Sequence, residues 1–319
     1  MPFDRKSLPS THRKFVQQFS DDQSCAAFLE KLRWPDGFCC PACQTTNEPW
    51  RQSRGRLVCP ACRHQTSVTT NTILDKTRTP LTTWFDAAWH LTTAKNGLSA
   101  KTLERTLGTC YRTAWAILQR FRVAMVRSER EKLSGLVEVD ETLVGGVKQG
   151  GKRGRGTSSA VVAIAVELME PMGFGRIRMR HIENASGTNL DAFVIDAITT
   201  GATVHTDGWT GYNGLTKLGY EHKRTIISSS DDPAHVAMPG VHRVASLLKR
   251  WILGTHQGSI VPEHLQSYLE EFTFRFNRRN SKNRGLVFFR LMEQVVATKP
   301  VTVDDVTHGY DWDHESRRS

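Results

Sequence analysis

Two short cysteine motifs constrain the fold of this chain more than any other feature of its sequence. Cys40 and Cys43 enclose two residues, as do Cys59 and Cys62, and fifteen residues separate the two pairs. At this spacing, two turns can present four thiolates to one tetrahedral zinc ion, and the connecting stretch 50–59 can form a β-hairpin. The sequence therefore predicts a zinc ribbon with a structural Zn²⁺ bound by these four cysteines.

The other three cysteines are interpreted as non-ligands. Cys39 stands directly before Cys40 and is one cysteine more than a two-residue spacing motif uses. Cys25 and Cys110 are expected to pack as small apolar side chains. Five of the seven cysteines fall between positions 39 and 62, and the N-terminus lacks the apolar core of a signal peptide. This clustering favours metal binding over disulfides.

The charge of the chain is unevenly distributed. Residues 1–134 contain 21 Lys and Arg against 11 Asp and Glu, whereas residues 135–319 contain 22 against 21. A basic first part is expected to approach a polyanion, which favours nucleic acid, although a basic surface can also serve solubility alone. No apolar run reaches the length of about 18 residues that a membrane helix needs. A cytoplasmic, nucleoid-associated protein without membrane contact is therefore expected.

Helical patterns dominate the first part outside the cysteine motifs. Residues 19–34 predict a short helix with Ser20, Asp21 or Asp22 as its N-cap. Residues 79–131 are helical almost throughout, with a turn at 107–109. This is the outline of a helix-turn-helix, whose second helix would bring Arg112 and Arg120 to a major groove. An ordinary helical hairpin remains the alternative, and the basic charge favours DNA.

From about residue 135 the pattern changes to strands. Three strands that can pair antiparallel are followed by a helix, SGTNLDAFVIDAI, and a further strand, GATVHTDGW, which is compatible with a mixed α/β sheet. Asp140 is placed at the end of the first strand and Asp207 at the end of the fourth, so the two can lie side by side. Such a pair can hold divalent metal, and two metals can activate a water or a 3′-hydroxyl. Glu141 points to the opposite face of an extended strand and is not expected to be a ligand.

Six motifs over about residues 20–292 are specific when they occur together. They are CPAC…CPAC, TILDKTRTPLTTWFDAAW, GLSAKTLERTLGTCYRTAW, VEVDETLVGG, HTDGWTGY and LLKRWILGTHQGSIVPEHLQSYLEEFTFRFNRR. With them the chain resembles bacterial insertion-sequence transposases of the ISXO2-like group, which join a zinc ribbon to a ribonuclease-H-like DDE domain. The resemblance implies a ribonuclease-H-like fold and Mg²⁺-dependent strand cleavage and transfer at element ends. It also implies Asp140 and Asp207 as the first two catalytic acids.

The third catalytic position departs from the family pattern. Members with a glutamate there have Lys or Arg seven residues later, and counting back seven from Lys249 reaches His242. Imidazole is a softer, neutral ligand, so Mn²⁺ should be relatively favoured over Mg²⁺. Lys249, on the same helix face, is expected to contact a phosphate. The open alternatives are an ordinary surface histidine at 242, or a third carboxylate from Asp231, Asp232, Glu270 or Glu271.

Two further basic clusters are candidates for DNA contact. The glycine-rich loop between the first two strands carries Lys148, Lys152, Arg153 and Arg155, which suit backbone contact without sequence readout, although a solvated hairpin tip is the alternative. Arg275, Arg278 and Arg279 lie together near Glu270 and Glu271, and structural pairing with these acids is equally compatible.

These observations predict a multidomain α+β protein. The expected parts are an N-terminal helical segment (1–34), a zinc ribbon (35–75), a helix-turn-helix-like region (76–134), a ribonuclease-H-like catalytic domain (135–292) and a C-terminal tail (293–319). We expect a transposase that binds terminal inverted repeats, cleaves the element end and joins the freed 3′-hydroxyl to target DNA. It is expected to act on DNA as a homodimer or higher oligomer. The alternatives are a DNA-binding regulator with a decayed catalytic body and a metal-dependent nuclease that does not join ends.

Overall fold

The computed structural model of the chain forms two compact units. It describes residues 7–127, 130–145, 159–169, 171, 173–225, 237–258, 260–310 and 312. The first unit combines Met1–Ser128 with Asn280–Ser319, and the second comprises Glu129–Arg279. In the described ranges, every helix is too short or too polar to cross a bilayer.

The first unit contains the predicted ribbon. Its strands β1 (Trp50–Gln52), β2 (Arg56–Val58) and β3 (Gln65–Thr66) form an antiparallel sheet in the order β1-β2-β3. The two cysteine turns that flank the hairpin are built alike. The carbonyl of Cys40 accepts from the N–H of Gln44, and that of Cys59 accepts from the N–H of Arg63. Gln44 and Arg63 both adopt left-handed backbone, with φ of 60° and 62°, and this conformation closes each turn.

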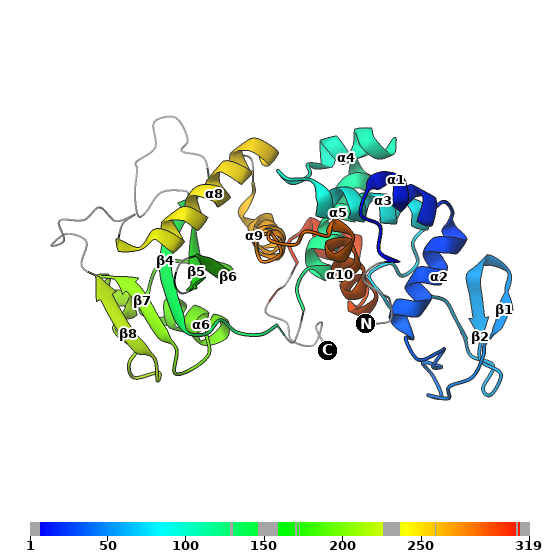
Figure 1. Ribbon diagram of the computed structural model, residues 1–319, viewed down its shortest axis with the longest axis horizontal. Helices are drawn as coiled ribbons and strands as arrows, with labels where there is room; N and C mark the ends of the chain where they lie inside the picture. Colours follow the sequence, from blue (N-terminus) through cyan, green and yellow to red (C-terminus); the bar gives the residue numbers. More distant parts are fainter. Residues whose placement is uncertain are drawn as a thin grey trace. The chain divides into compact units, whose positions relative to one another are not determined.

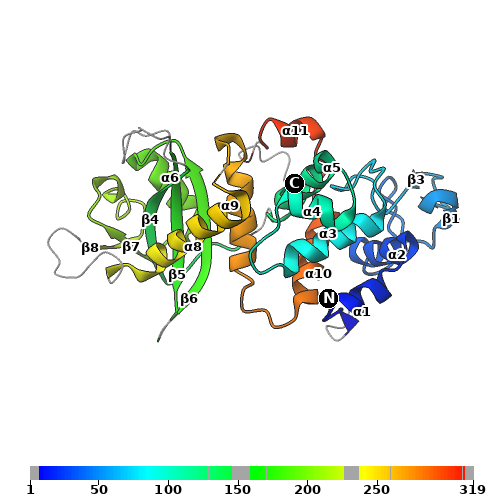
Figure 2. The same cartoon turned by 90° about the horizontal axis from the view of Figure 1, so that it is seen from above.

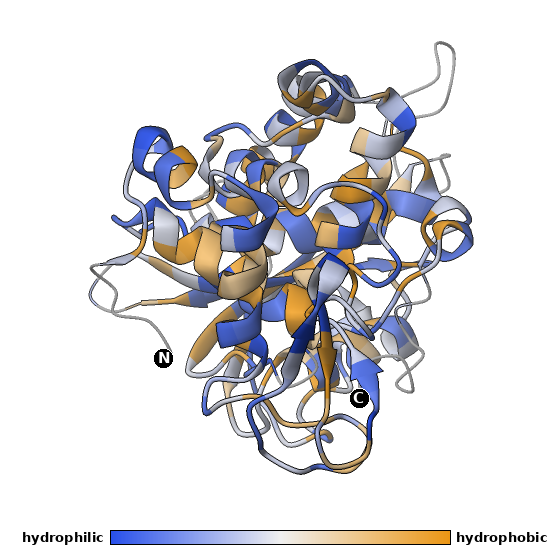
Figure 3. Ribbon diagram, turned by 90° about the vertical axis from the view of Figure 1, so that its right-hand side faces the viewer, coloured by the Kyte–Doolittle hydropathy of each residue, from blue (hydrophilic) through white to orange (hydrophobic). Residues whose placement is uncertain are grey.

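Seven helices accompany the ribbon in the described part of the first unit: α1 (His12–Gln18), α2 (Asp22–Arg33), α3 (Leu81–Thr93), α4 (Ala100–Leu107), α5 (Tyr111–Ala124), α10 (Arg284–Ala297) and α11 (Val303–Thr307). Local sequence sets their ends. Asp21 caps α2 by accepting from the N–H of Ser24 at 2.7 Å, and Ser99 caps α4 by accepting from Thr102. Figure 3 shows hydrophobic residues interleaved with hydrophilic ones along the helices, as expected when one side of each is buried.

The core of the first unit is an aromatic cluster joined by a helix from the far end of the sequence. Phe288 on α10 is fully buried, and its ring lies within 6.0 Å of the rings of Phe15, Phe28 and Phe85. Helix α10 contacts α2, α3 and α5. The sequence predicted a boundary at 292 and a tail at 293–319, whereas the structure groups Asn280–Ser319 with the first unit. The second unit ends at Arg279, because the apolar face of α10 is buried in the helical unit, and α11 packs on α5.

The two helices and the turn of the predicted helix-turn-helix are present as α4 and α5. Helix α4 ends at Gly108, which has left-handed backbone with φ of 62°, and α5 begins at Tyr111. Glycine suits this position because it has no Cβ to clash in left-handed backbone. The turn thus lies where the sequence predicted it.

The second unit is a five-stranded mixed sheet. Its strands are β4 (Leu136–Val144), β5 (Ala160–Leu168), β6 (Phe174–Ile182), β7 (Thr203–Asp207) and β8 (Glu221–Thr225), in the order β6-β5-β4-β7-β8. The first three pair antiparallel, whereas β7 is parallel to β4 and β8 is parallel to β7. This order confirms the predicted mixed, ribonuclease-H-like sheet. Strand β8 was not predicted, because its sequence EHKRT lacks an apolar face.

Helices cover both faces of this sheet. They are α6 (Gly187–Ala197), α8 (Pro239–His256) and α9 (Pro262–Phe276). Val137 and Val139 of β4 pack with Phe193 of α6, whereas Ile164 of β5 packs with Leu248 of α8. Figure 1 shows α6 and α8 on opposite sides of the sheet, and Figure 2 shows α8 lying across its strands. Successive side chains of β4 point to opposite faces of the sheet, so the even-numbered ones, including Asp140, lie on the α8 face.

Candidate functional sites

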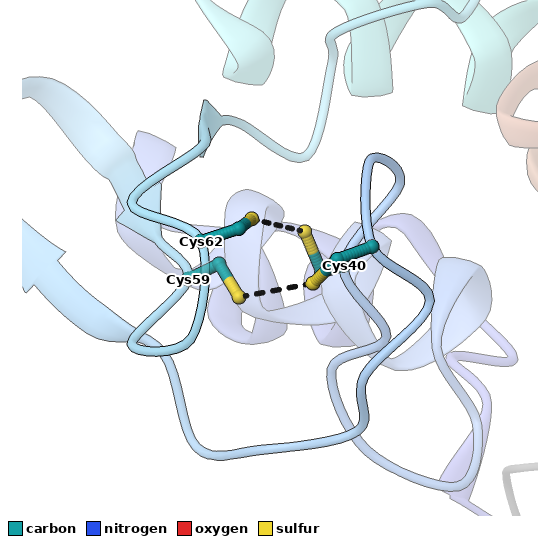
Figure 4. A group of neighbouring side chains, drawn as sticks. Cys40, Cys59 and Cys62 are labelled. Carbon is teal, nitrogen blue, oxygen red and sulfur yellow. Dashed lines mark hydrogen bonds between the residues drawn. The ribbon is translucent and has the colours of Figure 1, made fainter.

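The four ribbon cysteines converge as a zinc site requires. The sulfur of Cys40 lies 3.6 Å from that of Cys62, and the sulfur of Cys43 lies 3.7 Å from that of Cys59. All four sulfurs lie within 4.8 Å of one another, and Figure 4 shows the Cys40, Cys59 and Cys62 side chains pointing toward a common centre. Zn–S bonds of about 2.3 Å in a tetrahedron place sulfurs about 3.8 Å apart, so the cysteines fit structural zinc. Cys39 lies outside this group.

The acidity of these thiols also fits a cation at their centre. Hydrogen bonds from the Thr45 side chain and backbone lower the pKa of the Cys43 thiol to about 6. A hydrogen bond from the His64 backbone lowers the pKa of Cys62, but the adjacent Cys43 sulfur, burial and the other cysteines raise it to about 12. Four neighbouring thiols cannot all ionise unless a cation balances their charge. The opposed shifts of Cys43 and Cys62 reflect this mutual repulsion between neighbouring sulfurs.

The ribbon is fastened to α2 and forms a partly basic groove with it. Arg51 makes two hydrogen bonds to the carboxylate of Glu30, at 2.9 and 2.8 Å, and Arg33 donates to the carbonyls of Ser67 and Val68. A groove of about 1200 Å³ lies between α2, the ribbon and residues 77–81. Its charged lining residues are Lys31, Arg51, Arg54, Arg56, Arg78, Asp22, Glu30 and Glu48. The positive excess suits a polyanion.

Asp140 and Asp207 occupy matching positions on adjacent parallel strands. The register between β4 and β7 pairs Val137 with Val204 and Glu138 with His205. The two strands stop pairing there, and the same register continued by two residues would bring Asp140 level with Asp207. Residues level with each other on parallel strands point to the same face, so both carboxylates emerge on the α8 face. Asp207 ends β7 as predicted, whereas Asp140 lies inside β4, which continues to Val144 paired with β5 alone.

Backbone N–H groups hold these two carboxylates in place, and an aromatic hydroxyl holds the neighbouring Glu141. Asp140 accepts from the N–H of Glu141 at 2.8 Å, and Asp207 accepts from the N–H of Trp209 at 2.9 Å. The fully buried Tyr212 donates to Glu141 at 3.0 Å. Burial, followed by the charges of Glu141, Asp140 and Asp207, raises the pKa of Tyr212 well above its ordinary value. The charges of Glu141, Asp140 and Asp207 therefore all act on this buried hydroxyl. Glu141 lies on the face of β4 opposite to that of Asp140, as predicted.

The first turn of α8 is attached directly to β4 by Glu138. This carboxylate is 1% exposed and accepts from the N–H of Val241 at 2.9 Å and from the N–H of Gly240. Burial raises the pKa of Glu138, although both hydrogen bonds oppose the shift. Glu138 shares the strand face of Asp140, and His242 is the next residue after Val241. The contact thus brings the first turn of α8 to the face that carries Asp140.

The structure does not gather Asp140, Asp207 and His242 into one set of metal ligands. In the described ranges, two groups of three or more His, Cys, Asp or Glu ligand atoms lie within 4.8 Å of one another, and neither contains Asp140, Asp207 or His242. Lys249 is exposed on α8, two turns after His242.

The alternative third carboxylates are weaker candidates. Glu270 and Glu271 are buried and paired, with Arg130 at 2.8 Å and Arg275 at 3.4 Å respectively. They therefore belong to the packing of α9. Asp231 and Asp232 lie outside the described residues.

The predicted DNA-binding arginines have different surroundings. Arg112 is exposed in the first turn of α5. Arg120, by contrast, is half-buried and donates to the carbonyl of Val301 at 3.3 Å, so it packs α5 against the chain that leads to α11. Burial accordingly lowers the pKa of Arg120. The loop residues Lys148, Lys152, Arg153 and Arg155 lie outside the described residues.

The arginines after α9 have a structural role. Arg278 donates to the carbonyl of Phe274 at 3.1 Å, and Arg279 donates to the carbonyls of Gly175 and Phe174. These contacts, with the Arg275–Glu271 pair, favour the structural alternative for this cluster.

Glu138 and Tyr212 are site residues that the sequence reasoning missed. Glu138 stands two positions before Asp140 in an otherwise apolar strand, so alternation puts both on one face. A carboxylate in a buried strand needs hydrogen-bond partners. This requirement could have indicated from the sequence that Glu138 binds another element. Tyr212 follows the Asp207 strand in HTDGWTGY, but no spacing rule points its hydroxyl at Glu141.

The sequence matches two family models. Residues 132–277 match the family model described as ISXO2-like transposase domain, and residues 20–65 match the transposase zinc-ribbon domain. No curated protein matches the sequence.

Two solved structures resemble the fold. The catalytic core domain of BIV integrase is 16% identical, with 44% of this chain and 82% of that chain covered and a TM-score of 0.30. The Mos1 transposase in its paired-end complex with the left transposon end is 12% identical, with 67% and 76% covered and a TM-score of 0.32.

Proposed function

This chain belongs to the insertion-sequence transposases that carry an ISXO2-like DDE domain after a transposase zinc ribbon, and on that premise we propose which residues perform its DNA chemistry. Asp140 and Asp207 bind the catalytic divalent ions, Mg²⁺ or Mn²⁺, and His242 completes the site. The observation that supports this most is that each aspartate stands two residues beyond the last β4–β7 pair, Glu138 with His205, on adjacent parallel strands.

The two carboxylates present hard oxygen ligands at the end of the β4–β7 pairing, which is the donor set that these ions prefer. When bound, such ions generate the attacking oxygen and stabilise the leaving oxygen of a phosphodiester. Asp140 and Asp207 would hold these ions with their carboxylate oxygens. Lys249, on the face of α8 that carries His242, contacts a neighbouring phosphate of the element end.

DNA recognition is proposed for the first unit. The ribbon groove and Arg112, at the exposed start of α5, contact the terminal inverted repeats, with α5 as the recognition helix. The basic residues of 148–155 contact the DNA backbone. Joining two element ends to one target requires both ends to be held together, so the active form on DNA is a homodimer or a higher oligomer.

The aspartate roles are tested with inverted-repeat DNA and Mg²⁺ or Mn²⁺. Asp140→Asn and Asp207→Asn should each lower cleavage and strand transfer about 10³-fold or more, since several kcal/mol of transition-state stabilisation is lost. Both variants should still bind the DNA. Asp196→Asn is the matched control, because that carboxylate is exposed on α6 and forms its ion pair with Arg180, away from the aspartate pair. Undiminished cleavage by Asp140→Asn would refute the assignment. In the wild-type chain, cleavage without joined product would identify a nuclease, and binding without cleavage would identify a regulator.

The role of His242 needs its own test. His242→Ala should reduce joining, and His242→Glu should raise the ratio of activity with Mg²⁺ to activity with Mn²⁺, because a carboxylate is a harder ligand than imidazole. Ser246→Ala, exposed on the same helix, is the control. Undiminished joining by His242→Ala would exclude this residue from the site.

A further inference from the structure

A second group of metal-binding side chains lies in the first unit, separate from the ribbon cysteines. His12 begins α1, whereas Asp86 and His90 lie one turn apart on α3. The Nε2 atom of His12 lies 3.5 Å from Oδ1 of Asp86, and Nε2 of His90 lies 3.4 Å from the same oxygen. In the described part of the chain, this trio and the four cysteines are the two sets whose ligand atoms gather within 4.8 Å.

The separations suit metal ligands better than hydrogen-bonded partners. A hydrogen bond from imidazole to carboxylate spans about 2.7–3.2 Å. Ligands about 2.0–2.2 Å from a tetrahedral ion lie about 3.3–3.5 Å apart, which is the spacing found here. Oδ1 of Asp86 is buried, and neither imidazole meets it with the distance and angle of a regular hydrogen bond, although His90 and His12 lower the pKa of this carboxyl. Two imidazole nitrogens therefore face one buried oxygen at the distance that a shared cation would impose.

The surroundings of the trio strengthen such a site. The ring of Phe15 stacks on Trp89 at 4.7 Å, and both side chains are buried. The His12 ring lies 6.1 Å from Phe15 and 5.3 Å from the His90 ring. The buried rings of Phe15 and Trp89 lower the local dielectric and strengthen the attraction of a cation to the carboxylate. The His12 side chain is 53% exposed, so an ion can reach the ligands from solvent.

We propose that His12, Asp86 and His90 bind a divalent transition-metal ion such as Zn²⁺, and that this ion fixes α1 to α3. Two imidazoles and one carboxylate select zinc, cobalt, nickel or copper over magnesium. Helix α1 has only seven residues, which is too short to be stable alone, so its position depends on tertiary contacts. The metal adds one such contact between residues far apart in sequence.

Titration of the full chain, with zinc already in its ribbon and Mg²⁺ in excess, tests the proposal. Co²⁺ should bind with one additional equivalent at an imidazole–carboxylate site, recognised by weak visible bands without thiolate charge transfer. His12→Gln and His90→Gln should each weaken this binding at least tenfold. His308→Gln is the matched control, because His308 and Asp304 have the same i,i+4 arrangement without a second histidine. Asp140→Asn should keep the equivalent, which separates this site from the aspartate pair.

Trypsin provides a second readout that does not depend on stoichiometry. Arg13 and Lys14 are exposed on α1, so bound Zn²⁺ should slow cleavage after them in the wild-type chain but not in His12→Gln. The proposal is overturned if no additional equivalent binds, if His12→Gln binds Co²⁺ as tightly as wild type, or if His308→Gln loses as much. In each case the trio would be a polar contact between α1 and α3 and no more.

Discussion

At the scale of single residues, Glu138 connects the strand of Asp140 to the helix of His242. Its buried carboxylate accepts from the first two N–H groups of α8 that can donate, since Pro239 has none. Gly240 leaves room for this contact, because an added Cβ would lie 2.8 Å from Oε2 of Glu138 and the carboxylate would have to shift. The position of His242 over the sheet therefore depends on a residue that binds neither DNA nor metal in our proposal.

Glu138→Ala should destabilise the second unit by about 1–3 kcal/mol per unpaired N–H group, whereas Glu138→Gln keeps an acceptor and should retain the fold. Glu138 also predicts a pH dependence. Its raised pKa means that the unfolded chain loses the proton first, so the free energy of unfolding falls as pH rises through the folded pKa.

Urea unfolding of wild type and Glu138→Gln from about pH 4 to pH 7 measures this difference, since model glutamate titrates near 4.3. The glutamine variant has no proton to lose, so it should lack the part of the decline that Glu138 contributes. Parallel curves for the two proteins would contradict the prediction.

At the scale of elements, the ribbon has little apolar material with which to hold itself together. Its strands have two or three residues each, and on them only Leu57 and Val58 are buried hydrophobics. So small a hairpin is marginal without further support. Zinc at the four cysteines is therefore expected to supply most of its folding free energy.

Removal of the ribbon zinc should unfold this element alone. Cys59→Ala, or chelation, should release zinc, abolish hydrogen-exchange protection over residues 50–66 and weaken binding to inverted-repeat DNA. Protection of the β4–β7 sheet should remain, because that sheet lies in the other unit. Cys39→Ser is the control and should retain zinc, since Cys39 is outside the sulfur cluster. Loss of zinc from Cys39→Ser would show that the ligand set is wrong.

At the scale of the whole molecule, the chain leaves the helical unit, forms the sheet unit, and returns. The return segment contributes α10, whose Phe288 occupies the centre of the aromatic cluster. The second unit is continuous in sequence, from 129 to 279, whereas the first needs both ends of the chain.

Truncation tests this division. Residues 129–279 should fold alone with one cooperative transition, whereas a chain that ends at Arg279 should lose the helical core and its DNA binding. A chain that ends at Trp312 keeps α10 and α11 and is the control. Phe288→Ala should destabilise the first unit by about 3–5 kcal/mol, the usual cost of deleting a buried phenylalanine. Unaltered thermal unfolding of the chain that ends at Arg279 would contradict this division.

The sequence by itself determined the features that depend on local spacing or alternation. These are the four cysteines of one ribbon, the turn between α4 and α5, the first four strands of the sheet, and the faces of Asp140 and Glu141. Only the tertiary structure decided that α10 completes the first unit, that Arg120 bonds to Val301, and that Glu138 holds the start of α8. Each of these contacts joins residues at least a hundred positions apart, and periodicity along a chain carries no information about such partners. The trio of His12, Asp86 and His90 belongs with them, because its ligands meet only when α1 packs on α3.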